Sequence, residues 1–102
     1  MAAEQAFVIK FNFNTQDFDL LDELEDSLET TTGYHNLGVY DGYELNEDGT
    51  RGEFYITTAD AELLYKNLKP ILLDSRILQG SKVELQQLAD DGSVQILKEY
   101  TL

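Results

Sequence analysis

The stretch GVYDGYELNEDGTRGEFYI, residues 38–56, decides the fold because it contains two Asp-Gly steps, either of which could reverse the chain. Asp-Gly between alternating apolar residues is a strong signal for a β-hairpin turn. A turn at residues 41–42 would place Val39 opposite Glu44, whereas a turn at residues 48–49 lets the apolar residues of both segments share one side. We therefore predict a hairpin that turns at residues 48–49, with the earlier glycine inside its first strand, at a bulge or under a neighbouring aromatic side chain.

Alternation with a period of two predicts which side chains of this hairpin face the core. In the first strand the predicted core side carries Leu37, Val39, Tyr43 and Leu45. In the second strand it carries Phe54, Ile56 and Thr58. Asp41 also falls on the apolar side, where a carboxylate needs a hydrogen-bond partner or a raised pKa. We favour the alternative that the bulge turns the Asp41 side chain out to solvent.

A strand and a helix are predicted upstream of the hairpin. Residues 7–13 alternate, and one face of this strand carries Phe7, Ile9, Phe11 and Phe13. An apolar stripe at steps of three and four residues then predicts a helix with Phe18, Leu21, Leu24 and Leu28 on its buried side. Asn14 or Thr15 suits the N-cap of this helix, and Gly33 suits its C-terminal end, where a positive φ is often required.

A second helix and a second hairpin are predicted downstream. Thr58, Ala59 and Asp60 supply the N-cap. The apolar stripe consists of Ala61, Leu64, Leu68, Ile71 and Leu72. Pro70 lies inside this stripe and should kink or break the helix near Lys69, because proline removes one backbone hydrogen bond. Asp91-Gly92 then predicts a turn between a strand at residues 83–86 and a last strand at residues 94–100.

The order of predicted elements is β-α-β-β-α-β-β within one domain, residues 1–102. This order predicts an α+β protein, a ferredoxin-like βαββαβ sandwich with an extra C-terminal strand beside the fourth. The sheet would be antiparallel with five strands, and both helices would cover one face. The other, open face is expected to carry mostly polar side chains, namely Val8, Lys10, Asn12, Tyr40, Glu44, Glu53, Tyr55, Thr57, Glu84 and Gln86.

Charge is the most unusual property of the sequence. Twenty acidic and seven basic residues give a formal net charge of −13, and the first half holds twelve of the acids with Lys10 as its only base. Such a field repels nucleic acid and anionic membranes and attracts basic proteins or cations. We therefore expect no nucleic-acid partner and no membrane partner. Solubility alone is the alternative explanation of the acidity.

The compartment is predicted from what the sequence lacks. It contains no cysteine, no basic N-terminal region followed by a long apolar run, and no apolar stretch long enough for a membrane span. These features predict a cytoplasmic protein.

Several chemistries fit the sequence poorly. The loop at residues 44–55 resembles a calcium loop but ends in Tyr55, where a bidentate Glu is required. Residues 51–58 resemble an RNA-recognition signature, but Glu53 occupies a position that needs a stacking aromatic. No phosphate-binding glycine pattern and no serine nucleophile motif is present. We predict no metal, no cofactor and no catalytic residue, and we lean against an enzyme.

The first helix is the leading candidate for a functional surface. Its candidate partner-binding residues are Asp17, Asp19, Asp22, Glu23, Glu25, Asp26 and Glu29. No Lys or Arg interrupts this series, although like charges four residues apart each cost a helix about 0.2–0.5 kcal/mol. The expected function is a binding or regulatory module that contacts a basic protein, for example as an immunity-type inhibitor of a basic toxin.

Two alternatives stay open. One is a small-ligand or catalytic site around Asp41, whose candidate residues are His35, Asp41, Tyr43 and Glu53. The other is a homodimer, for which the open face offers Val8, Tyr40 and Tyr55 as apolar anchors.

The sequence resembles a family of small, acidic, uncharacterised bacterial proteins. The resemblance rests on Asp41-Gly42, on residues 52–56, on Thr58 and Asp60 before the second helix, on residues 69–72, and on Gly80 before residues 83–85. It implies a bacterial origin and a βαββαβ-type fold. It implies no reaction, ligand or site residue.

Overall fold

The structure, a computed structural model, describes residues 4–13, 18–34, 36–75 and 78–102. Five strands and two helices follow in the order β1 (Gln5–Asn12), α1 (Phe18–Tyr34), β2 (Gly38–Leu45), β3 (Arg51–Thr58), α2 (Ala61–Asp74), β4 (Lys82–Leu88) and β5 (Val94–Thr101). The predicted element order and the α+β class are confirmed.

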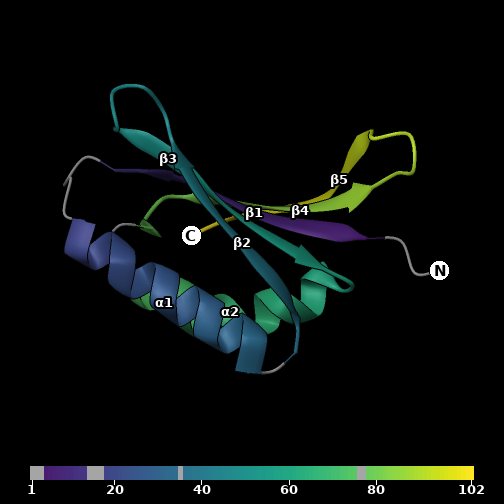
Figure 1. Ribbon diagram of the computed structural model, residues 1–102, viewed down its shortest axis with the longest axis horizontal. Helices are drawn as coiled ribbons and strands as arrows, with labels where there is room; N and C mark the ends of the chain where they lie inside the picture. The colour runs from purple at the N-terminus through teal and green to yellow at the C-terminus, as the bar shows by residue number, and fades with distance from the viewer. Residues whose placement is uncertain (1–3, 14–17, 35, 76–77) are drawn as a thin grey trace.

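One antiparallel sheet contains all five strands in the order β2-β3-β1-β4-β5. β1 lies at the centre and pairs with β3 on one side and β4 on the other, so β2 and β5 form the two edges. Both helices cover the same face of the sheet (Figure 1). α1 lies beside β2, and α2 packs on α1, β1 and β4. Among the described residues, no helix lies on the other face, which we call the open face.

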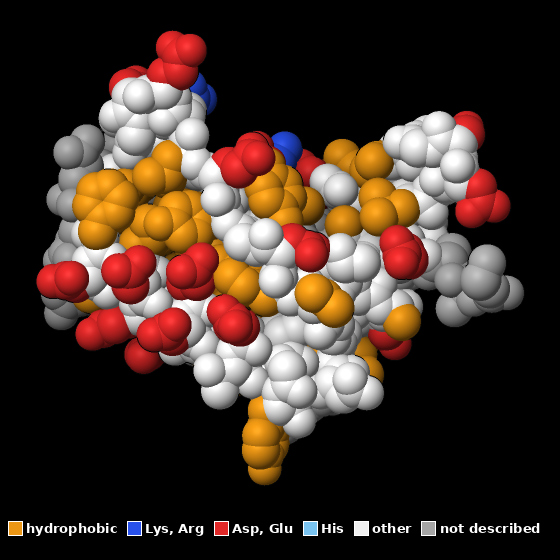
Figure 2. Space-filling view, in the orientation of Figure 1, with side chains coloured by type: hydrophobic (Ala, Val, Ile, Leu, Met, Phe, Trp, Pro, Cys, Tyr) orange, Lys and Arg blue, Asp and Glu red, His pale blue; other side chains and the backbone are white. Residues whose placement is uncertain are grey.

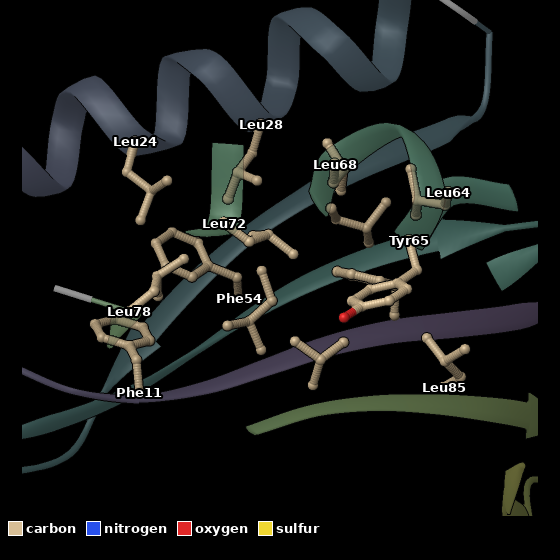
Figure 3. Close-up of a cluster of buried hydrophobic side chains, with 14 of the residues drawn as sticks. Phe11, Leu24, Leu28, Phe54, Leu64, Tyr65, Leu68, Leu72, Leu78 and Leu85 are labelled. Atoms are coloured by element: carbon tan, nitrogen blue, oxygen red, sulfur yellow. The ribbon is translucent and has the colours of Figure 1, made fainter. Parts of the chain in front are cut away.

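The core lies between the sheet and the two helices (Figure 3). Leu24 and Leu28 of α1 point toward the sheet, and Phe11 and Phe54 point up from the strands to meet them. The four predicted residues of β1 and its extension are all buried, namely Phe7, Ile9, Phe11 and Phe13. Sequence periodicity missed Tyr65 and Leu78, which are also buried in this core.

α2 begins as predicted and continues farther than predicted. The Asp60 side chain accepts a hydrogen bond from the backbone N–H of Leu63 at 3.1 Å, which is the geometry of an N-cap. The helix then runs through Pro70 to Asp74. The helix therefore does not break near Lys69, because packing of the apolar stripe maintains it across the missing hydrogen bond, and a kink there stays a prediction.

α1 ends later than predicted. Gly33 lies within the last helical turn, and the residue with positive φ is Asn36, at 51°. The backbone N–H of Leu37 donates to the Thr32 carbonyl at 2.9 Å, and that of Asn36 donates to the Gly33 carbonyl at 3.1 Å. These two bonds form a Schellman motif, in which Asn replaces the more usual Gly at the left-handed position. The predicted N-cap residues of α1 lie outside the described residues.

The β2–β3 hairpin turns at Gly49 as predicted, and Tyr43 lies opposite Phe54. The register shifts between Tyr40 and Gly42, which confirms the bulge at Gly42. The bulge also corrects two predicted faces. Tyr40 pairs with Ile56 and packs against the core, whereas Val39 lies on the open face with 63% of its surface exposed. One extra residue exchanges the faces of all residues on its far side.

The open face is less exposed than its composition predicts. Val8 and Glu84 lie there as direct cross-strand partners, and both are buried, with exposures of 4% and 6%. The Glu84 carboxylate accepts hydrogen bonds from Lys10 Nζ at 3.0 Å and from Gln86 Nε2 at 3.0 Å. A buried carboxylate is tolerated here because both oxygens have donors.

Candidate functional site

The acidic residues of α1 fall on two sides of the helix. The spacing of 100° per residue places Asp22, Glu25 and Glu29 on the side that faces β2. Glu23 lies on the opposite side, where it lines a groove toward α2, and Asp26 points outward. Asp19, in the first turn, also lies on the outer side. Asp17, another predicted partner-binding residue, lies outside the described residues.

Two tyrosines of β2 meet the carboxylates on the β2 side. The Tyr40 hydroxyl donates a hydrogen bond to Glu25 at 2.8 Å. Burial and this bond raise the pKa of Tyr40 well above its ordinary value. Burial, followed by the charges of Glu25 and Asp22, raises the pKa of Tyr43. Both phenols are therefore neutral at physiological pH and remain hydrogen-bond donors.

The tyrosine rings are held by the core. Their centroids lie 6.4 Å (Tyr40) and 5.6 Å (Tyr43) from that of Phe54, which stacks on Phe11 at 4.8 Å. Both rings are half-buried. They therefore add apolar area to the surface and have less conformational freedom than a long exposed side chain.

We call the set Asp22, Glu25, Glu29, Tyr40 and Tyr43 the acidic–aromatic surface. In Figure 2 a row of carboxylates runs along α1, directly below an apolar patch on the side of β2 and β3. Carboxylates bind Lys and Arg through charge-assisted hydrogen bonds, and tyrosine rings attract the same cations through their faces. Aromatic residues also carry much of the binding energy in protein interfaces. The arrangement is therefore chemically suited to basic side chains.

The residues predicted around Asp41 do not converge. Asp41 is exposed, and its carboxylate accepts a hydrogen bond from Thr57 Oγ1 at 2.6 Å. Tyr43 lies on the helix side of the sheet, and Glu53 lies on the open face, where it accepts a bond from the Tyr55 hydroxyl at 2.8 Å. His35 lies outside the described residues. No cavity brings the three described members together.

The polar residues of the β2–β3 turn serve the turn itself. Asp48 accepts bonds from the backbone N–H and the hydroxyl of Thr50, and Asn46 accepts one from the backbone N–H of Arg51. The bonds from Thr50 hold the pKa of Asp48 below its usual value.

Within the described part of the chain, no three His, Cys, Asp or Glu side chains are grouped to hold a metal ion. No helix in this part is long and apolar enough to cross a membrane.

Sequence reasoning placed Tyr40 on the wrong face and so missed the tyrosine that contacts the acidic helix. The available signal was Asp41-Gly42, which indicated a bulge but not the register of Tyr40 against Ile56. Of the seven predicted acidic residues, the structure brings three together with the tyrosines.

Comparison with known proteins adds information about the fold. No protein-family model matches the sequence, and no curated protein matches it. Among solved structures, the chain is similar to that of Rv0793 from Mycobacterium tuberculosis, with a TM-score of 0.64 and 18% sequence identity. The likeness covers 89% of this chain and 100% of the other. At this identity the two chains share an α+β fold, and the likeness says nothing of function.

Proposed function

We propose that the protein is a non-enzymatic recognition module that binds a basic protein through the acidic–aromatic surface. In this proposal the module acts in the cytoplasm of a bacterium, and one concrete form of its activity is the inhibition of a basic toxin by an immunity-type protein. The net charge of the chain does not indicate where a partner would bind. The acidic–aromatic surface gives the proposed position.

The fold proposed for the module is ferredoxin-like. The first four strands lie in the order β2-β3-β1-β4, so β1 is inserted between the two later strands that pair with it. β5 extends this arrangement beside β4 as the predicted extra strand.

The observation that carries the proposal is the side-by-side placement of carboxylates and anchored tyrosines. Glu25 is tied to Tyr40, while Asp22 and Glu29 are exposed on either side of it along the helix. A surface that served only solubility would not need neutral aromatic donors among its charges. A Lys or Arg of a partner would find a carboxylate and a ring face within reach of one another.

Charge would also speed the encounter. A net charge of −13 attracts a basic partner over distances comparable to the Debye length, about 10 Å at 0.1 M salt. Because carboxylates at the rim act mainly on association, we expect salt to slow binding more than it speeds dissociation.

The test is a pair of matched double variants on one helix. Asp22→Asn with Glu29→Gln removes two charges beside the tyrosines, and Glu23→Gln with Asp26→Asn removes the same two residue types from the other sides. Captures from native lysate at low and moderate salt, followed by calorimetry with the recovered partner, measure both variants. We expect the first variant to lose about tenfold or more in affinity, or roughly 1.4 kcal/mol, and the second to lose far less.

Equal losses in the two variants would contradict the acidic–aromatic surface and leave only a general effect of charge. A partner that binds both variants and the wild type alike would contradict the proposal itself. Light scattering on the same samples measures the mass, so that a homodimer, the alternative form of association, is recognised directly.

A further inference from the structure

The open face of the sheet contains a cavity of about 610 Å³ that the proposed function does not use. Its charged lining residues are Lys10, Glu44, Arg51, Glu53 and Lys82. It lies on the side of the sheet opposite the helices, and its lining residues belong to β1, to the ends of β2 and β3 near their turn, and to the start of β4. Small-ligand pockets in proteins have volumes of roughly 300–1,000 Å³, so the size suits a small molecule.

A row of four charged side chains crosses this cavity from strand to strand. Glu44 lies directly opposite Glu53, Glu53 opposite Lys10, and Lys10 opposite Lys82. Like charges directly opposite each other destabilise a sheet. The row contains two such pairs, an acidic pair on β2 and β3 and a basic pair on β1 and β4.

No ion pair joins the acidic pair to the basic pair within the described residues, although the charge of Glu53 contributes to the raised pKa of Lys10. Lys10 forms its ion pair with Glu84, at 3.0 Å, and Lys82 reaches Glu99 at 3.7 Å. In the part of the chain that the structure describes, no basic side chain lies within 4.0 Å of the Glu44 carboxylate. Likewise, no acidic side chain in this part of the chain lies within 4.0 Å of the Arg51 guanidinium. Both lysines therefore have acidic partners outside the cavity lining, whereas Glu44 and Arg51 are lining residues without an ion pair among the described residues.

The lining contains neutral polar groups as well. Asn12 and Asn46 supply side-chain amides, and Ser81 supplies a hydroxyl. The Tyr55 hydroxyl also lines the cavity, and burial, with the bond to Glu53, raises the pKa of Tyr55 to about 12. These groups can donate and accept hydrogen bonds without adding net charge.

We propose that this cavity binds a small zwitterion, a molecule that carries an ammonium group and a carboxylate group as a free amino acid does. The ammonium group lies toward Glu44 on β2, and the carboxylate lies toward Arg51 on β3. A simple anion would meet the Glu44 carboxylate, and a simple cation would meet the Arg51 guanidinium, so a ligand with both charges matches both groups. The inference does not depend on the proposed protein partner, because the two surfaces share no residue.

The experiment uses the full chain and the common free amino acids as probes. Each is added at millimolar concentration, and binding is followed by thermal unfolding and by the backbone amide signals of β1, β3 and β4 in NMR spectra. The best amino acid is then compared with its methyl ester, which lacks the carboxylate, and with its N-acetyl derivative, which lacks the ammonium group. We expect both derivatives to bind at least tenfold more weakly.

Two variants test the assigned residues. Glu44→Gln and Arg51→Gln should each weaken binding at least tenfold. The unliganded Glu44→Gln variant should unfold at the same temperature as the wild type or a higher one, because its like-charge contact with Glu53 has been removed. Glu47→Gln is the matched control at the turn, outside the cavity lining, and should bind like the wild type. No response to any amino acid would overturn the proposal. Equal binding of the N-acetyl derivative, or unchanged affinity in Glu44→Gln, would also overturn it.

Discussion

Glu84 illustrates how single residues are stabilised on the uncovered side of the sheet. Burial would raise the pKa of its carboxyl, but the hydrogen bonds from Lys10 and Gln86 outweigh burial, and the pKa of Glu84 lies below its usual value. The Glu84 hydrogen bond likewise raises the pKa of Lys10. The pair therefore favours the folded state when both groups are charged.

Replacement of Glu84 by Gln tests this balance. The pKa of Glu84 is lower in the folded protein than in the unfolded chain. Its charged carboxylate therefore stabilises the folded state above the unfolded pKa of about 4.3, and this stabilisation is lost as the pH falls through the folded pKa. At pH 7 we expect Glu84→Gln to cost about 1–3 kcal/mol in the free energy of unfolding. Urea unfolding of both proteins from pH 7 to pH 3 should show this difference shrinking below about pH 4. Glu23→Gln, at an exposed position, is the control, and a difference that did not change with pH would contradict the assignment.

At the scale of the elements, two glycines that look alike in the sequence have opposite roles. Gly33 lies in the last turn of α1 without a positive φ, and a Cβ added there would meet nothing within 4 Å. At Gly52 in β3 an added Cβ would lie 2.7 Å from the Phe11 ring and 2.8 Å from the Glu44 carbonyl oxygen. The glycine at position 52 is therefore required by packing, and the one at position 33 is not.

Alanine substitutions measure this contrast. We expect Gly33→Ala to stabilise the protein by about 0.4–1 kcal/mol, because alanine favours the helix and restricts the unfolded chain. Gly52→Ala should destabilise it by about 1–3 kcal/mol, because Phe11 or the backbone of β2 must move. Thermal and chemical unfolding give both values. A destabilising Gly33→Ala would mean that this glycine ends the helix after all.

Local signals predicted most of the elements. Asp60 as a cap, the turn at Gly49 and the buried stripe of α2 all depend on residues close in sequence. The faces of β2 before the bulge could not be predicted, because the register of Tyr40 against Ile56 depends on pairing with another strand. The same shift decided the candidate site, since it brought Tyr40 to Glu25. The charged row on the open face likewise becomes visible only once three separate registers are known.

At the scale of the whole molecule, the net charge of −13 acts on every state of the chain. Compact folding brings like charges closer together than they are in the unfolded chain, so self-repulsion opposes folding. Three ion pairs are present among the described residues, and two of them join exposed side chains, where each is worth about 0–1 kcal/mol. Repulsion should therefore outweigh attraction.

Salt should consequently stabilise the protein. Screening shortens the range of repulsion from about 10 Å at 0.1 M to about 3 Å at 1 M ionic strength. We expect the unfolding temperature to rise as sodium chloride is added over this range. The Asp22→Asn, Glu29→Gln variant carries two fewer negative charges and should show a smaller rise. A fall in the unfolding temperature with salt would mean that attractive pairs dominate.

The central position of β1 has a consequence for how the chain is made. Protein synthesis proceeds from the N-terminus, so β1 emerges before both of its neighbours, β3 and β4. Until β3 has been synthesised, one edge of β1 has no partner strand, and its other edge has none until β4 follows, beyond α2. Contacts between such distant segments also form slowly. The strand that is best protected in the finished protein is thus the one exposed longest in the nascent chain, where chaperones would have to shield it from other unfinished copies.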